Sequence, residues 1–263
     1  MLVLGILLFA MLIAGVVLNT IFLIREIRRN ERHDSFINSV THELKTPVAS
    51  IRLYLETLKM REPESGKRKE FYNVMLADTE RLMGTIDQVL QAGRTGSAPR
   101  LLHKTTIDLT ELVQDCVAVA RLRHHLPEDA LDLTAEPGSW VEGDPEELKA
   151  AVSNLLDNAI KYSSGTVKVR AEVGSAHDGK IAVRVRDEGV GIPTHEMKRI
   201  FKRFYRIPGT ITQKVKGTGL GLFIVNAIAK RHGGRVYAES PGHGHGSTFT
   251  IELPIAGPQR SRS

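Results

Sequence analysis

The chain has 263 residues, enough for about two domains that each bury a core. Its hydrophobic fraction of 41% and charged fraction of 25% are those of an ordinary globular protein. The net charge of +6 is spread along the chain, without a basic stripe or interleaved aromatic side chains, so we expect no nucleic-acid partner. The single cysteine, Cys116, excludes an internal disulfide and falls in the apolar pattern of a helix.

The first 24 residues are not typical of a globular domain. Residues 2–24 carry no charge, and as a helix of about 1.5 Å per residue they exceed a hydrocarbon core of about 30 Å. Four arginines follow within eight residues, which places the C-terminal side in the cytoplasm. A secretory signal is the alternative, but its apolar core would be shorter and its positive charges would come first. We therefore predict a transmembrane helix over residues 1–24, crossing the cell inner (cytoplasmic) membrane once.

Residues 36–93 have the pattern of a helical hairpin, which a short juxtamembrane helix over residues 25–35 joins to the membrane segment. The first apolar stripe repeats at steps of three and four: Phe36, Val40, Leu44, Val48, Ile51, Leu55 and Leu58. After a break at residues 61–66, a second stripe comprises Phe71, Val74, Met75, Leu82, Ile86 and Val89. Two such hairpins can pair into a four-helix bundle, and the alternative is a hairpin packed onto its own downstream domain.

We predict a linker over residues 94–103, because residues 92–99 are rich in small and turn-forming types. Residues 104–256 then combine helices with alternating strands, and residues 257–263 form a tail. We expect helices over 109–122 and from Asp144 onward, where an acidic N-cap precedes Pro145. Expected strands cover residues 166–173, 181–187, 235–239 and 247–253, with the first two joined as a hairpin. The predicted domain is an α+β sandwich, a mixed sheet with helices on one face.

One histidine lies in a helix where its side chain is predicted to face solvent. His42 is about 200° around the helix from Val40, off the apolar stripe, and an exposed neutral imidazole is a competent nucleophile. Glu43 can orient the ring or take its proton. Pro47 lacks an N–H, so we expect the helix to bend near His42.

A second group of polar residues follows Asp144. Asn154, Asn158, Lys161 and Tyr162 recur at steps of three and four and share one helix face. The amide oxygen of Asn158 suits Mg²⁺, which prefers oxygen ligands. Lys161 can neutralise phosphate charge, and the ring of Tyr162 can lie against a base.

A buried acid and two glycine-rich segments complete the pattern. Asp187 is in phase with the apolar residues of its strand, so its carboxylate is predicted to be buried and to need a partner. Gly189 and Gly191 follow it and allow close backbone approach. The second segment, Gly217, Thr218, Gly219, Leu220 and Gly221, precedes a predicted helix, whose N-terminal N–H groups attract phosphate.

Together these segments resemble the motifs of sensor histidine kinases of two-component systems, over about residues 30 to 254. The resemblance implies a dimerising phosphotransfer hairpin and an ATP-binding domain of the histidine kinase/gyrase type. In this chain it makes His42 the phosphoacceptor, with Thr46 positioning water for dephosphorylation. It makes Asn158 the Mg²⁺ ligand and Asp187 the partner of the adenine amino group, and gives Arg206, at the end of residues 201–206, a role in contacting phosphates. Residues 207–216 would then be a lid over ATP.

The resemblance implies a homodimeric membrane kinase that binds ATP and Mg²⁺ and phosphorylates His42. The phosphate would pass to an aspartate in the receiver domain of a separate response regulator, with phosphatase activity as well. Asn154 stands where hydrolysing relatives carry a glutamate base, which favours phosphoryl transfer over hydrolysis. Two alternatives are an ATPase of the same superfamily and a catalytically silent membrane scaffold. With one apolar span, the chain is either a piece of a longer sensor or receives its stimulus through the membrane or a partner.

Two histidines in the run Gly242–Gly246 form a further candidate site. They lie in an expected strand connection without matching ligands, so we do not expect them to bind zinc.

Overall fold

A computed structural model describes residues 2–61, 63–94, 103–176, 178–209, 215 and 217–256. The chain divides into two compact units, Met1–Leu82 and Met83–Ser263. Each unit is described by itself below.

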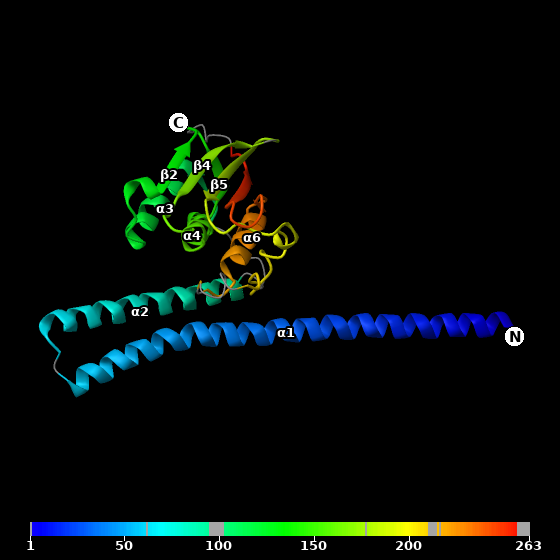
Figure 1. The fold of residues 1–263 in the computed structure, drawn as a ribbon. Helices are drawn as coiled ribbons and strands as arrows, with labels where there is room; N and C mark the ends of the chain where they lie inside the picture. Colours follow the sequence, from blue (N-terminus) through cyan, green and yellow to red (C-terminus); the bar gives the residue numbers. More distant parts are fainter. Residues whose placement is uncertain are drawn as a thin grey trace. The chain divides into compact units, whose positions relative to one another are not determined.

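The N-terminal unit is built on one very long helix. Helix α1 runs from Leu2 to Met60 without interruption, passing through Pro47 (Figure 1). The prediction that the apolar segment leads almost directly into the hairpin is therefore confirmed. The bend expected near His42 stays a prediction, because the helix continues on both sides of the proline.

Helix α2 (Ser65–Arg94) returns after the short connection that contains Pro63, and its residues up to Leu82 belong to the same unit. Contacts between the described residues of the two helices include a ring pair and an ion pair. The rings of Tyr54 and Phe71 lie with centroids 4.9 Å apart, and Arg81 forms an ion pair with Glu43. The predicted helical hairpin is thus present.

The segment Val3–Ile24 is long and apolar enough to cross a membrane, and none of it is buried within the structure. Its side chains are exposed to a degree that is unfavourable in water. Length and composition agree with the predicted span, which a signal sequence would also satisfy.

The C-terminal unit is a mixed five-stranded sheet with helices on one face (Figure 1). The sheet order is β2 (Leu131–Ala135), β4 (Val169–Ala176), β5 (Lys180–Asp187), β7 (Ser247–Pro254) and β6 (Arg235–Glu239). Strands β2 and β4 are parallel, and the other neighbours are antiparallel. A separate two-stranded sheet pairs β1 (Thr105–Asp108) with β3 (Trp140–Gly143), and a short 3-10 helix, η1 (Glu128–Ala130), precedes β2.

The helices of this unit begin where the sequence provides N-terminal caps. Asp144 accepts hydrogen bonds from the backbone N–H groups of Glu146 and Glu147 and starts α4 (Pro145–Lys161), as predicted. Asp108 caps α3 (Leu109–Arg123) in the same way. Helix α6 (Gly221–Arg231) directly follows the second glycine-rich segment. The apolar faces of α3, α4 and α6 share one core with the inner face of the sheet.

Strand β6 has its predicted bounds, β5 and β7 differ from theirs by one residue at one end, and β4 differs at both ends and continues to Ala176. Residues 166–173 were expected to form a strand, but β4 begins at Val169, where it pairs with the first residue of β2. Strands β1, β2 and β3 were not predicted. They are four or five residues long, too short to show a clear alternation.

Candidate functional site

A cavity of about 290 Å³ lies within the C-terminal unit, between α4, the end of β5 and the segments on either side of α6. It brings together most of the residues singled out in the sequence. Its lining includes Asn154, Asn158, Lys161, Tyr162, Asp187, Gly191, Arg206, Gly217, Thr218, Gly219 and Gly221. Segments almost 70 residues apart in sequence therefore converge on one pocket, a size suited to a small-molecule ligand.

Helix α4 presents its polar face to this cavity, as the spacing predicted. Asn154 donates a hydrogen bond from its amide nitrogen to the carbonyl of Ala150, 2.8 Å away, one turn earlier in the helix. Asn158, Lys161 and Tyr162 follow on the same face. The cavity thus has amide and ammonium groups along one wall.

The carboxylate of Asp187 is buried at the end of β5, with 4% of the residue exposed. Its Oδ1 atom accepts hydrogen bonds from the N–H groups of Gly189, at 2.9 Å, and Ser247, at 3.2 Å. Burial raises the pKa of Asp187, and the two N–H groups oppose this rise. Both bonds go to Oδ1, and among the described residues none donates to Oδ2. The second oxygen is therefore available to a donor in the cavity.

Gly189 allows a close approach within the protein itself, and its predicted approach to the nucleotide stays a prediction. A Cβ atom there would lie 2.2 Å from the carbonyl oxygen of Tyr162 and 2.8 Å from Oδ1 of Asp187. The close approach allowed by this glycine is thus between the end of α4 and the end of β5, and Gly189 does not line the cavity. Gly191 does line it. Leu220 lies between the two lining residues Gly219 and Gly221, and its side chain is fully buried in the core.

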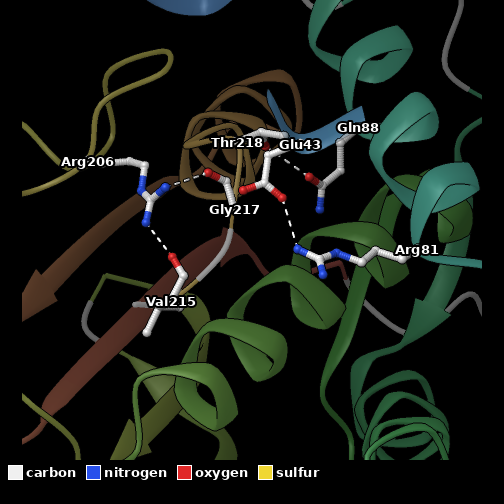
Figure 2. Close-up of polar contacts among 7 residues, drawn as sticks. All are labelled: Glu43, Arg81, Gln88, Arg206, Val215, Gly217 and Thr218. Atoms are coloured by element: carbon white, nitrogen blue, oxygen red, sulfur yellow. Dashed lines mark hydrogen bonds and ion pairs between the residues drawn. The ribbon is translucent and has the colours of Figure 1, made fainter. Parts of the chain in front are cut away.

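Arg206 lies at the cavity wall but is held by the protein itself (Figure 2). Its Nη1 donates to the carbonyl of Gly217 at 3.0 Å, and its Nη2 to the carbonyl of Val215. Burial raises the pKa of the Tyr162 hydroxyl, and the nearby positive charge of Arg206 partly lowers it. The predicted contact of Arg206 with phosphate stays a prediction. Of residues 207–216, the expected lid, residues 210–214 and 216 lie outside the described residues.

Several cavity residues were not identified from the sequence as site residues, among them Gln88 and His243. Thr218 donates its hydroxyl proton to Oε1 of Gln88 at 3.1 Å, and Gln88 also lines the cavity (Figure 2). Gln88 lies in α2, where a polar residue between apolar ones gives no sign of a binding role. His243, from the run rejected as a zinc site, lines the same cavity, whereas His245 does not.

The candidate acceptor segment lies on α1, in the N-terminal unit. The backbone of His42 is helical, but its side chain lies outside the described residues. The neighbouring Glu43 is 9% exposed and accepts a hydrogen bond from Arg81 at 3.1 Å (Figure 2). Thr46 follows one turn after His42 on the same helix and is half-buried. Glu43 is thus oriented by an arginine from α2.

Comparisons with known protein families agree with both halves of this description. Residues 32–98 match the family described as the His Kinase A (phospho-acceptor) domain. Residues 143–257 match the family described as histidine kinase-, DNA gyrase B-, and HSP90-like ATPase. The first match contains His42, and the second contains the cavity residues from Asn154 to Gly221.

Individual proteins give the same result. The chain is 31% identical over 235 residues to sensor protein kinase WalK of Staphylococcus saprophyticus, covering 88% of this chain and 37% of the relative. It is 30% identical to the solved structure of the mycobacterial sensor histidine kinase MprB, covering 57% of this chain and 97% of that one, with a TM-score of 0.50. The protein belongs to the sensor histidine kinases of two-component systems.

The fold is shared more widely. Histidine kinase ThkA, solved in complex with response regulator protein TrrA, has a TM-score of 0.62 at 22% identity, covering 89% of this chain and 66% of that one. The chain spans about 37% of the length of WalK, so the activity and partners of the whole protein are treated as proposals below.

Proposed function

We propose that the protein is a membrane-bound sensor histidine kinase that uses ATP and Mg²⁺ to phosphorylate His42 and then passes the phosphate to an aspartate of a separate response regulator. The observation that carries this proposal is the cavity, which combines a buried acid, two asparagines and a glycine-rich segment before a helix. Such a segment presents N–H groups and a positive helix end to phosphate.

Asp187 is proposed to select adenine. Its free Oδ2 can accept a hydrogen bond from an exocyclic amino group, whereas the carbonyl of guanine at that place would face a carboxylate. Tyr162, at the end of α4, offers a ring beside the base. The positive charge of Arg206 lies near its hydroxyl.

The donor set fits Mg²⁺ bound through phosphate. Asn158 supplies an amide oxygen, and Mg²⁺ commonly takes few protein ligands together with phosphate oxygens. The acid beside it, Asp157, is engaged by His124 at 2.9 Å and Arg123 at 3.6 Å, so we assign the metal to Asn158. When bound, the cation would neutralise charge on the phosphates. Lys161 adds a second positive charge at the same wall.

The proposed transfer step forms one bond and breaks one. A ring nitrogen of His42 attacks the γ-phosphorus, and the bond from phosphorus to the bridging β–γ oxygen breaks, releasing ADP. The proton on the other ring nitrogen then leaves, and Glu43 is the proposed acceptor. Its ion pair with Arg81 fixes the carboxylate beside the acceptor residue. Arg206 is proposed to release a carbonyl and steady charge on the transferred group.

We propose that the helical hairpin pairs with the hairpin of a second copy of this chain. The segment Val3–Ile24 is proposed to lie in the membrane. Leu55 and Leu76 are 53% and 61% exposed, which leaves apolar area for a second hairpin to cover. The match to the phospho-acceptor family supports this dimer. The ThkA–TrrA complex gives a precedent in the same fold for a response regulator as partner. Dephosphorylation of that regulator, with Thr46 holding water, completes the proposal.

The test is incubation of the full chain, in detergent micelles, with γ-labelled ATP and Mg²⁺. We expect an acid-labile, alkali-stable phosphoprotein, the signature of a phosphorus–nitrogen bond. Release of phosphate without labelled protein would instead support an ATPase, and ATP binding with neither product would support a silent scaffold.

A further inference from the structure

The C-terminal unit holds a buried acid that the proposed mechanism does not use. Glu196 closes the short 3-10 helix η2 (Thr194–Glu196), between the two glycine-rich segments, and only 4% of it is exposed. A carboxylate removed from water is costly unless charged or hydrogen-bonding partners surround it. Its burial therefore implies that defined side-chain partners stabilise it.

Arg199 and Tyr205 hold the two carboxylate oxygens of this acid. Oε1 of Glu196 accepts from Nη1 of Arg199 at 2.9 Å, and Oε2 accepts from the hydroxyl of Tyr205 at 2.5 Å. The guanidinium of Arg199 also lies 4.7 Å from the ring centroid of Tyr205, a cation–π contact. The exposed His195 is 3.5 Å from Oε1. We call Glu196, Arg199 and Tyr205 the Glu196 cluster.

The hydroxyl of Tyr205 is a permanent donor in this cluster. Burial, followed by the hydrogen bond to Glu196 and its charge, raises the pKa of Tyr205 to about 12. The hydroxyl consequently stays protonated at physiological pH, and the bond to Glu196 persists.

The cluster is attached to a backbone turn that needs support. Phe204, just before Tyr205, has φ of +62°, a left-handed conformation that is unfavourable for a bulky side chain. Its N–H donates to the carbonyl of Gly219 at 3.1 Å. A Cβ atom at Gly219, itself at φ +70°, would lie 2.9 Å from the carbonyl carbon of Phe204. The turn thus packs directly on the second glycine-rich segment.

This turn carries two cavity residues. Tyr205 and Arg206 both line the cavity, and Arg206 extends to the carbonyl of Gly217. Any displacement of the backbone at Phe204 would move both side chains together with the contact to Gly219. The hydrogen bond from the Tyr205 hydroxyl to Glu196 is a side-chain contact that ties the turn to η2, outside the cavity.

We propose that Glu196 is a positioning residue for nucleotide binding and phosphoryl transfer: through the hydroxyl of Tyr205 it holds the left-handed turn that sets Tyr205 and Arg206 at the cavity wall. This inference rests on the proposed use of ATP at the same site. It adds a residue that touches neither nucleotide nor acceptor.

The test compares Glu196→Ala, Tyr205→Phe, the double variant and Glu196→Gln in the full chain in detergent micelles. Calorimetric ATP affinity and the KM and kcat of autophosphorylation are measured for each. Because misplacement of a binding group commonly costs an order of magnitude or more, we expect KM for ATP to rise about 10-fold in each of the first two variants. The double variant should be no worse than the worse single one, because both remove the same bond. Glu196→Gln should recover most of the loss, since its amide oxygen still accepts from Tyr205.

Glu128→Ala is the matched control, an exposed glutamate in the same unit, and should leave KM and kcat unchanged. An unmodified protein that fails to bind ATP would overturn the proposed function itself. Suppose instead that the unmodified protein binds ATP and that KM and kcat are unchanged in Glu196→Ala and Tyr205→Phe. That result would overturn only this inference, even if the two variants were less stable in urea. If Glu196→Ala does not fold, Tyr205→Phe decides alone, because it removes one hydroxyl and keeps the ring.

Discussion

The two units of this chain differ in how completely they bury their apolar side chains. In the C-terminal unit, α3, α4 and α6 enclose one core with the sheet, and leucines such as Leu155 and Leu156 are fully buried. In the N-terminal unit, Leu55 and Leu76 are more than half exposed, as is most of Val3–Ile24. The C-terminal unit therefore completes its core within one chain, whereas the hairpin and the apolar segment leave apolar side chains exposed, which we propose a second copy and a membrane cover.

The two proposed steps, nucleotide binding and phosphate acceptance, are also divided between these two units. Every described residue of the nucleotide cavity belongs to the unit with the complete core, and the acceptor segment belongs to the unit with the incomplete one. Binding should therefore survive changes in the N-terminal unit, up to Leu82, and transfer should not. The predictions below test this separation.

The largest effect is expected from His42→Gln. Because a glutamine amide cannot replace the nucleophilic nitrogen, labelling from γ-labelled ATP should fall to background, while the ATP affinity should stay within about twofold, as expected for an independent site. Labelling and calorimetric titration on one preparation measure both. Label that persists in the variant would remove His42 from the mechanism.

Leu55→Glu should break the dimer. A carboxylate placed in the proposed apolar interface of both copies should weaken self-association by roughly 100-fold or more. Sedimentation of the full chain in detergent measures this change. Glu56→Lys, an exposed position about 100° around the same helix and off the apolar stripe, is the control and should remain dimeric. An unmodified chain that sediments as a monomer would refute the bundle.

Asp187→Asn should separate stability from binding in the C-terminal unit. The amide keeps an oxygen for the N–H groups of Gly189 and Ser247, but it loses the negative acceptor for adenine. We expect ATP affinity to fall about 10- to 100-fold, the range for an unsatisfied buried polar contact, and preference over GTP to shrink. Equal affinity of the unmodified protein for ATP and GTP would contradict the assignment.

The stability of Asp187→Asn relative to the unmodified protein should also depend on pH. A raised pKa of Asp187 means that the folded state holds the proton more tightly than the unfolded one. The stabilising contribution of this proton is complete below the unfolded pKa of about 4 and is lost as pH rises through the folded pKa. Asp187→Asn should therefore unfold at higher urea than the unmodified protein at pH 7, with a smaller difference near pH 4. An equal difference at both pH values would mean that the buried charge is not the cause.

Thr46→Ala is expected to have the smallest effect. Its hydroxyl can hold a water beside the acceptor position but cannot act as the nucleophile. Autophosphorylation should be unchanged, and dephosphorylation of the regulator should slow about 10-fold, the value of a lost hydrogen bond. Both rates are measured with one purified regulator. Unchanged dephosphorylation would leave Thr46 with a purely structural role before Pro47.

Much of the C-terminal unit could be predicted because its signals are local. The cap at Asp144, the polar face of α4 and the burial of Asp187 follow from spacing along one helix or strand. The start of β4 could not be predicted in this way, because the strand begins where a neighbour, Leu131, is available for pairing.

The missed site residues depend on contacts between distant segments. Gln88 meets Thr218 across 130 residues, and no pattern within α2 marks it. Glu196 and Tyr205 are only nine residues apart, but their bond requires the left-handed turn at Phe204, which sequence patterns do not indicate for a phenylalanine. The side chain of His42, by contrast, was identified from its motif and lies outside the described residues.

Because the helix from Leu2 to Met60 is unbroken, the direction of the acceptor face around the helix axis is fixed relative to the apolar segment. An α-helix advances about 100° per residue, so a residue inserted between Ile24 and His42 would turn the acceptor face by that angle relative to the apolar segment. Seven inserted residues would return it almost to its starting direction. A stimulus that rotates the apolar segment would accordingly reach His42 as a rotation, without a joint to absorb it, and the response to insertions should be periodic in their length.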